Sequence, residues 1–444
     1  MPPRITRLTI ILAIAVFATS LYANLPHALG LERLYIYVPP FDGRDLSLVD
    51  HLGGEHRSIA EALAAGRGFA DPFHDRTGPT AWVGPLLPIL LALLLVLGGI
   101  NLAVITIVFL QNITLVFTGW LVARAAARCD WPRAPVIGLM LYFAATWSYF
   151  SSCYQFTHDA WLTMLLLGVL VYSTDRLWAR SIGRRTAISW GLLGGVATLA
   201  SPVLGPVWFA VTVVLGRSSR QARPFLLSVL VAAAVMMPWI ARNAIVFGRF
   251  IPVKSNLPFE MYQSNALEPS GVLRDETGYK HPFRTAGTER AHYAKLGEVA
   301  YLDEYRARFA QVIRRDPAGY LVRVKNRLLA ATVVYYPFFD NEGPRRVLVR
   351  SLIYTLPIVG LVVVVVTRRW ARDHLALIAI VIFVIYLTPY VLVAYYRRYA
   401  VPLAGLQAMF EIWGLDSIRA FVIHRRRADD QQLSTADGDE IPHR

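Results

Sequence analysis

A carboxylate that could act as a general base lies in the segment Gly53-Gly54-Glu55-His56. The residues that follow predict a short amphipathic helix, because Ile59 and Leu63 share a helix face and Gly66 is a natural helix stop. Glu55 would lie in its first turn, where the helix dipole and free backbone N–H groups favour the ionised form. An ionised carboxylate beside a membrane cavity can remove a proton from an attacking hydroxyl. The alternative is a helix-start Glu on a solvated face.

A second acid, Asp159, ends the segment Gln155-Phe156-Thr157-His158-Asp159, directly before an apolar run. A carboxylate at a helix start is commonly a cap. The same position would also let Asp159 face the cavity that Glu55 faces, and the sequence leaves both interpretations open.

Four arginines are expected on the outer side of the membrane, where the positive-inside trend predicts few. Arg242 and Arg249 follow one apolar run, and Arg397 and Arg398 follow another. A guanidinium group can hold a phosphate with two parallel hydrogen bonds. Snorkelling to ordinary lipid headgroups is the alternative for each. Two such sites on one outer face favour a shared anionic ligand.

One cluster could hold a metal ion. His74 with Asp71 and Asp75 could bind a divalent cation. A polar loop is the more common explanation of such a cluster, because no ligand spacing stands out. The sequence predicts no other cofactor.

The elements that position these residues follow from composition. The chain has 444 residues, of which 55% are hydrophobic and 17% charged, with a mean hydropathy of +0.43. A soluble protein carries about 25% charged residues. These values exclude a soluble enzyme, a disordered protein and a fibre, and they predict an all-α polytopic membrane protein. Two cysteines exclude a disulfide scaffold.

The net charge of +15 is carried mostly by Arg, which clusters beside hydrophobic segments. Cytoplasmic loops show this pattern, so the charge does not indicate nucleic-acid binding. Abundant Arg with scarce Lys is typical of a GC-rich bacterial genome. The Arg-rich linkers contain Arg124–Arg133, Arg176–Arg185, Arg217–Arg223, Arg368–Arg372 and Arg425–Arg427.

Placing these linkers in the cytoplasm predicts about ten membrane spans with both termini inside. The first is a retained anchor from Leu8 to about Ala23, because no convincing signal-peptide cleavage site follows it. The run 85–98 is interpreted as re-entrant or interfacial, with its start disturbed by Pro85 and Pro88; if it spans, the count becomes eleven. The other spans are 101–123, 134–152, 160–178, 188–201, 203–216, 225–241, 347–366, 374–393 and 400–416.

The weakest of these spans are 188–201 and 203–216, which could be two short helices or one broken helix. Within the outer polar subdomain, Ala291–Arg314 predicts a helix that Asp316-Pro317 ends. The polar tail from 428 is expected to be disordered. The expected organisation is an anchor (1–24), outer loop one with juxtamembrane helices (25–100), spans two to seven (101–241), the outer subdomain (242–346), spans eight to ten (347–418) and a cytoplasmic tail (419–444).

Four blocks of the chain resemble the GT-C membrane glycosyltransferases, the superfamily of the protein O-mannosyltransferases and the lipid A aminoarabinose transferase. Their order and predicted topology agree with that superfamily. The chain departs from its best-known members because Gly54, not an acid, precedes Glu55; Asp42, Asp45 or Asp50 could be the base instead. The blocks are Glu55–Phe69 with the strip Gly78–Pro88, Pro238–Phe250, the set His281-Pro282-Phe283, Gly297–Tyr301 and Asp316-Pro317, and Arg398-Tyr399 before Pro402.

The resemblance implies an inverting transfer of sugar from a polyprenyl-phosphate donor to a glycan, lipid or protein acceptor. The reaction would take place on the outer side of a bacterial cytoplasmic membrane, where nucleotide sugars are absent. Glu55 or Asp159 would be the base, and Arg242, Arg249, Arg397 and Arg398 would bind the phosphate. The candidates for other substrate contacts are Trp82, His158, Asn243 and Tyr399.

Two other function classes remain open. A transporter or flippase would place ionisable residues near the middle of spans. In this chain the spans hold Gln111, Asn112 and hydroxyl groups, and the acids lie at outer helix ends, which favours surface chemistry. A non-catalytic scaffold for envelope assembly would tolerate neutral substitutions at the outer Glu and Arg residues.

Overall fold

The computed structural model of the chain describes residues 54–73, 76–152, 159–274, 281–283, 288–333 and 344–436, together with Ile10, Ile11 and Ile14. In these ranges every regular secondary-structure element is a helix, and β-pairing is limited to two isolated bridges. The predicted all-α class is confirmed for this part of the chain. Most of the expected anchor, and Asp42, Asp45 and Asp50, lie outside the described residues.

Helices occur where the apolar runs predicted them. Four of them, α4, α6, α9 and α17, are long and apolar enough to cross a membrane. The chain therefore has the helices of a multi-pass membrane protein, and the count of about ten spans stays a prediction. The helices are α4 (Leu86–Ala126), α5 (Ala134–Ser152), α6 (Ala160–Leu177), α7 (Arg184–Ala200), α8 (Leu204–Ser219), α9 (Ala222–Phe247), α15 (Pro344–Val366), α17 (His374–Leu392) and α18 (Ala404–Ala436).

Helix α4 is interrupted near its middle. Gly98 and Gly99 leave helical geometry, and Gly99 has a φ of +71°, which only glycine adopts without strain. The run 86–97 therefore forms a separate helix about 18 Å long. This is shorter than the roughly 30 Å hydrocarbon core of a bilayer, in keeping with a re-entrant or interfacial role. Pro88 lies in the first turn, where its missing N–H costs no bond, so the expected disturbance of the helix start is absent.

The pair α7 and α8 forms a hairpin of two helices, which decides between the two interpretations of 188–201 and 203–216. Ser201 between them has extended backbone. The Trp190 indole N–H donates to Thr212 at 2.8 Å, and the Trp208 indole N–H donates to the Trp190 carbonyl at 3.1 Å. Gly194 lies against the Trp208 ring, so the two helices approach closely.

The outer subdomain contains helices on both sides of a break that the sequence analysis missed. Gly297, with a φ of +76°, divides the predicted helix Ala291–Arg314 into two. Asp316-Pro317 ends the second of these as predicted, and Asp316 Oδ1 caps the next helix by accepting from Gly319 N at 2.8 Å. The elements are α10 (Leu257–Tyr262), the π-helix η2 (Gln263–Leu267), α12 (Thr288–Leu296), α13 (Glu298–Arg315) and α14 (Pro317–Thr332).

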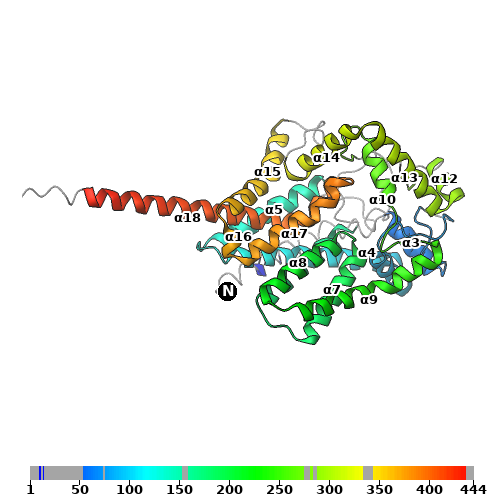
Figure 1. The fold of residues 1–444 in the computed structure, drawn as a ribbon, viewed down its shortest axis with the longest axis horizontal. Coiled ribbons are helices and arrows are strands. Elements are labelled where there is room, and N and C mark those ends of the chain that lie inside the picture. Colours follow the sequence, from blue (N-terminus) through cyan, green and yellow to red (C-terminus); the bar gives the residue numbers. More distant parts are fainter. Residues whose placement is uncertain are drawn as a thin grey trace, which may run out of the picture.

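The helices place two groups of elements at opposite ends of the molecule. Figure 1 shows α3 (Gly54–Ala64), α10, α12 and α13 at one end, and α16 (Arg369–Arg372) with the projecting part of α18 at the other. The expected outer loop one and outer subdomain thus lie together. The α6 helix connects the two ends, since 18 residues extend about 27 Å.

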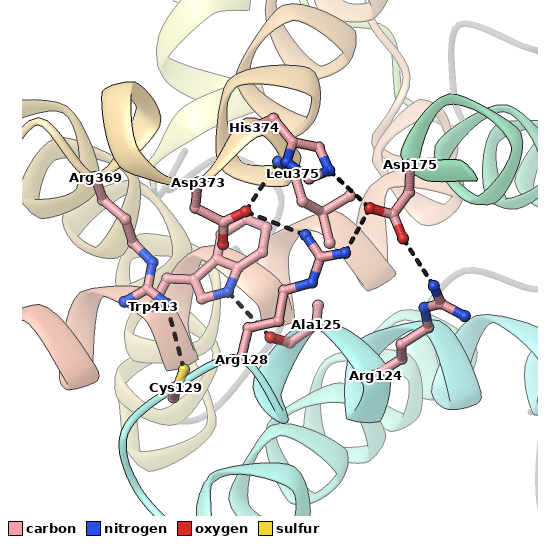
Figure 2. A network of polar contacts seen from close by, with 10 residues as sticks. All are labelled: Arg124, Ala125, Arg128, Cys129, Asp175, Arg369, Asp373, His374, Leu375 and Trp413. Atoms are coloured by element: carbon pink, nitrogen blue, oxygen red, sulfur yellow. Dashed lines mark hydrogen bonds and ion pairs between the residues drawn. The ribbon is translucent and has the colours of Figure 1, made fainter. Parts of the chain in front are cut away.

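A polar network joins several helix ends at the α16 end (Figure 2). Asp175 accepts hydrogen bonds from Arg124 and Arg128, and His374 Nε2 lies 2.9 Å from its Oδ1 atom. Arg128 also reaches Asp373. A second pair, Arg369 with Asp416 at 2.7 Å, joins α16 to α18. The Arg-rich linkers after α4 and before α17 therefore meet at one end, as the positive-inside pattern requires; their cytoplasmic location stays a prediction.

The expected disorder from residue 428 is wrong for the first part of the tail, because α18 continues through Ala436. The segment 425–436 contains Arg, Ala, Gln and Leu, which favour helices, and no Gly or Pro interrupts it before Gly438.

Candidate active site

Helix α3 carries Glu55 in its first turn, as predicted. The helix ends at Ala64, and Gly66 follows with a φ of +74°. Ile59 is fully buried, and Ala60 belongs to the main hydrophobic core. This buried face fixes the start of α3 against the membrane helices. Its location on a membrane surface stays a prediction.

The start of α3 contacts a segment more than 200 residues further along the chain. A Cβ atom on Gly54 would lie 2.2 Å from Cζ of Phe283, so any larger residue there would force the Phe283 ring to move. His281 Nε2 lies 3.7 Å from Glu55 Oε1, and His281 Nδ1 accepts from Phe283 N at 3.2 Å. That bond places the proton of a neutral His281 on Nε2, the atom that faces Glu55.

A cluster of aromatic side chains supports this contact. The His281 ring lies edge-on to Phe259, Phe73 and Trp82, with centroids 5.3, 5.6 and 5.8 Å away. Trp82 is 1% exposed, so its ring is packed inside the protein. Apart from Phe73 of loop one, the rings around Trp82 come from the outer subdomain, and sequence alone could not pair them with loop one. A substrate contact of Trp82 stays a prediction.

Glu298 fastens the strip around Thr80 to the outer subdomain. Its carboxylate accepts from the Thr80 hydroxyl, from Ala81 N at 2.8 Å and from the Tyr293 hydroxyl at 2.8 Å. Burial raises the pKa of Glu298, and these hydrogen bonds oppose that shift. Nothing in the sequence indicates this role of Glu298; the available signal is its position after Gly297, at a helix start.

Arg242 and Asn243 hold the end of α9 against loop one. Arg242 donates through Nη1 to the Thr80 carbonyl at 2.7 Å and through Nη2 to the Phe69 carbonyl at 2.8 Å. Asn243 donates to the Ile251 carbonyl at 2.9 Å and accepts from Arg242. These contacts give both residues a role in the fold. The contacts do not test the predicted role of Arg242 in phosphate binding or that of Asn243 in substrate binding.

Arg249 lies apart from these contacts, on the surface of the outer subdomain. Its Nη1 atom forms an ion pair with Asp303 at 2.7 Å, and nearly half of the Arg249 side chain is exposed. Exposed pairs of this kind contribute about 0–1 kcal/mol. A phosphate contact of Arg249 stays a prediction.

The neighbouring Glu55 and three charged residues from distant parts of the chain, Asp159, Lys254 and Arg398, act electrostatically on His56, which is 8% exposed. Burial lowers the pKa of His56; Asp159 and Glu55 oppose this shift, and Arg398 and Lys254 reinforce it. His56 is therefore neutral at neutral pH. The structure brings the predicted acids Glu55 and Asp159 and the predicted arginine Arg398 into one electrostatic cluster.

Asp159 occupies the N-cap position of α6 but makes no cap hydrogen bond through its side chain. Of the two interpretations left open by the sequence, the cap is therefore wrong. The Asp159 charge acts instead on Arg398 and on Tyr390 of α17. His158, its neighbour, lies outside the described residues.

The two neighbouring arginines of the 3₁₀ helix η4 (Arg397–Leu403) differ in their contacts. Arg397 donates to the Tyr354 hydroxyl of α15 from Nε at 3.1 Å and from Nη2 at 2.6 Å. Arg398 lies over the rings of Tyr396 and Tyr399, at 4.9 and 5.4 Å from their centroids. Arg398 is thus the one whose charge acts on the cluster around His56.

Tyr399 links η4 to α17 and to a further acid. Its ring stacks on that of Tyr390 with centroids 4.2 Å apart. Burial raises the pKa of Tyr399, and Glu260 on α10 raises it further. Glu260 and Arg398 both act on Tyr390 as well. Glu260 was missed from the sequence because no pattern relates α10 to the residues near 398.

Helix α14 holds the chain segment that leads to Arg398. Arg327 is fully buried and donates through Nε to the Val391 carbonyl at 2.7 Å and through Nη2 to the Leu392 carbonyl at 3.2 Å. The hydroxyl of Tyr320 donates to the same Leu392 carbonyl at 3.0 Å. The outer subdomain therefore positions η4, and with it Arg398.

The predicted divalent-cation cluster can be followed only at Asp71, since His74 and Asp75 lie outside the described residues. Asp71 Oδ1 accepts from Gly78 N and Oδ2 accepts from Arg67 Nε, both at 3.0 Å. Both oxygens thus have a role in the turn that closes this loop. Among the residues that the structure describes, no group of three or more His, Cys, Asp and Glu could hold a metal ion.

No protein-family model matches the sequence, and no curated protein matches it. Among solved structures, the chain is similar to ArnT from Cupriavidus metallidurans, whose crystal structure contains undecaprenyl phosphate. The TM-score is 0.39 and the sequence identity 13%, over 94% of this chain and 78% of that one. A likeness this distant carries no weight for the function.

Proposed function

We propose that the chain is a membrane glycosyltransferase that moves a sugar from a polyprenyl phosphate to an acceptor hydroxyl on the outer side of the membrane. The observation that carries the proposal is the convergence of Glu55, Asp159 and Arg398 around the buried His56. This cluster joins a base to a phosphate-binding cation. Helix α3, which carries Glu55 and His56, lies at the end of the molecule opposite α16 (Figure 1).

In the proposed reaction, Glu55 takes the proton of the acceptor hydroxyl as its oxygen attacks the anomeric carbon. The bond from that carbon to the phosphate oxygen breaks, and the polyprenyl phosphate leaves with one additional negative charge. Arg398 stabilises this charge, with Arg397 beside it in the chain. Attack opposite the leaving phosphate inverts the anomeric carbon. Asp159 is the rival base, and its action on Arg398 also suits it to orient that guanidinium.

The four outer arginines divide by their contacts. Arg398 is the main phosphate ligand of the proposal, since its charge acts on the cluster. Arg242 and Arg249 are weaker candidates for phosphate binding, because protein oxygens already accept their hydrogen bonds. The acceptor is a glycan, a lipid or a protein.

Binding of polyprenyl phosphate to the full chain in nanodiscs tests this division. Arg398→Lys keeps the charge but loses the planar fork, and the affinity should fall by about tenfold or more. Arg306→Lys, on the exposed face of α13, is the matched control and should bind normally. Equal binding by wild type and Arg398→Lys removes Arg398 from the phosphate site.

One observation favours a second candidate, a transporter. The predicted span 400–416 contains Glu411, which is 8% exposed, so the expectation that acids lie only at the outer ends of spans is wrong. Ionisable residues inside a membrane often mark a transport path. If the chain is a transporter, Glu411→Gln should abolish movement of lipid-linked sugar between leaflets. If it is a glycosyltransferase, the same variant should retain sugar transfer.

A further inference from the structure

Three buried polar atoms near the candidate active site lack a hydrogen-bond partner in the part of the chain that the structure describes. They are Nδ1 of His56, Oδ1 of Asn256 and Oε2 of Glu260. Asn256 is 4% exposed and His56 is 8% exposed. Buried polar atoms in proteins are almost always bonded, so three exceptions near one site indicate a missing ligand.

Asn256 and Glu260 form a pair at the expense of a helix cap. Asn256 occupies the N-cap position of α10, where its side-chain oxygen would normally accept from a backbone N–H of the first turn. It makes no such bond; its Nδ2 atom donates instead to Glu260 Oε1 at 3.2 Å. This arrangement fixes both side chains and leaves one acceptor atom on each.

The pair belongs to the same cluster as the proposed phosphate ligand. Glu260 acts electrostatically on both Tyr390 and Tyr399, whose rings are stacked, and Arg398 acts on both as well. Asp159 acts on Tyr390 too. Asp159 and Arg398 also act electrostatically on His56, although His56 is far from both in the sequence.

The chemistry of the three atoms selects a class of ligand. A carboxylate oxygen and an amide oxygen only accept hydrogen bonds, and a neutral imidazole can accept or donate. A phosphate also only accepts, so it does not fit Glu260 and Asn256. A ligand that fits must donate, as sugar hydroxyl groups do. A metal ion is disfavoured because the described residues hold no group of three ligand side chains.

We infer that Glu260, Asn256 and His56 form the subsite that recognises the hydroxyl groups of the donor sugar. The inference rests on the proposed function above, since it takes a polyprenyl-phosphate sugar as the donor. Arg398 binds the phosphate, and the Glu260–Asn256 pair binds the sugar attached to it. The subsite thus distinguishes a loaded donor from the bare lipid product.

The test compares binding of two kinds of probe to the full chain in nanodiscs. One probe is bare polyprenyl phosphate, and the others are the same lipid bearing a mannosyl, glucosyl or arabinosyl group. Wild type should bind at least one sugar-bearing probe more tightly than the bare lipid. Glu260→Gln and Asn256→Ala should each weaken that binding by about tenfold, the effect of one lost hydrogen bond to a charged group.

Binding of the bare lipid serves as the internal control, because it should be unchanged in both variants and so reports an intact fold. Glu61→Gln, on the exposed side of α3, should bind every probe normally. Arg398→Lys should weaken all probes alike. These three results separate a sugar subsite from a phosphate site and from general loss of structure.

Several outcomes would overturn the inference. If Glu260→Gln weakens binding of both kinds of probe equally, the Glu260–Asn256 pair supports phosphate binding or the fold and not the sugar. If the variant binds both kinds of probe as wild type does, water occupies the hydrogen-bonding positions of these atoms. A preference for sugar that EDTA removes indicates a cation site. Wild type that binds the bare lipid without any preference for sugar contradicts the subsite and leaves the proposed function standing. Wild type that binds no probe contradicts both.

Discussion

Gly54 lies so close to Phe283 that a Cβ atom would come within 2.2 Å of the ring. The contact joins the start of α3 to the segment that carries His281, and His281 Nε2 faces Glu55 at 3.7 Å. A side chain at this position, directly before the proposed base, would therefore displace the Phe283 ring.

Gly54→Ala should displace the Phe283 segment from Glu55. We expect a loss of about 1–3 kcal/mol in stability, typical of overpacking, and a fall in sugar transfer. Thermal unfolding in detergent and a transfer assay measure the two effects. Gly183→Ala is the control, because a Cβ there meets nothing within 4 Å and it should be neutral. Unchanged transfer by Gly54→Ala would separate this contact from catalysis.

Glu298→Gln tests the attachment of loop one to the outer subdomain. The substitution replaces one carboxylate oxygen by an NH2 group, which cannot accept; the remaining amide oxygen can serve either Ala81 N or the Thr80 and Tyr293 hydroxyls, but not both sides. The melting temperature should drop by an amount equivalent to about 1–3 kcal/mol. The exposed Glu61→Gln should change it little. A melting curve identical to that of wild type would show that these bonds add nothing to stability.

His56 predicts a dependence of stability on pH. Burial holds the pKa of His56 below its ordinary value of 6.5, so the unfolded chain binds a proton more readily than the folded one. The stability contributed by neutral His56 is therefore complete above about pH 6.5 and is lost as the pH falls below that value. The free energy of unfolding of wild type and His56→Gln, measured between about pH 7.5 and pH 5, tests this effect, because a histidine titrates in that range. The variant should show the weaker dependence; equal slopes would exclude His56 as the cause.

The parts of this account that sequence could predict are those set by local pattern. The apolar runs predicted helices α4 to α9, α15, α17 and α18, and the spacing of Ile59, Leu63 and Gly66 predicted α3. Asp316-Pro317 ends α13 because proline restricts the residue before it. These signals act within a few residues.

Contacts between distant segments could not be predicted in the same way. No local signal shows that Arg398 acts on His56 while its neighbour Arg397 bonds to Tyr354, since packing against α15 and α17 decides it. Glu260 was missed for the same reason. The break at Gly297 was missed because glycine inside a helical pattern only sometimes interrupts it. The break at Gly98-Gly99, in contrast, agrees with the predicted division between the run 85–98 and the span 101–123.

The most direct test of the central claim is sugar transfer by Glu55→Gln in full-length protein supplied with a polyprenyl-phosphate sugar. The substitution keeps the size of the side chain and removes its basicity. Transfer should fall by at least about 10²-fold, the lower range for general-base catalysis, while binding of polyprenyl phosphate stays unchanged. Glu61→Gln on the same helix should transfer sugar normally. Normal transfer by Glu55→Gln, with none by Asp159→Asn, would contradict the assignment of Glu55 as the base; normal transfer by both would contradict the proposed active site.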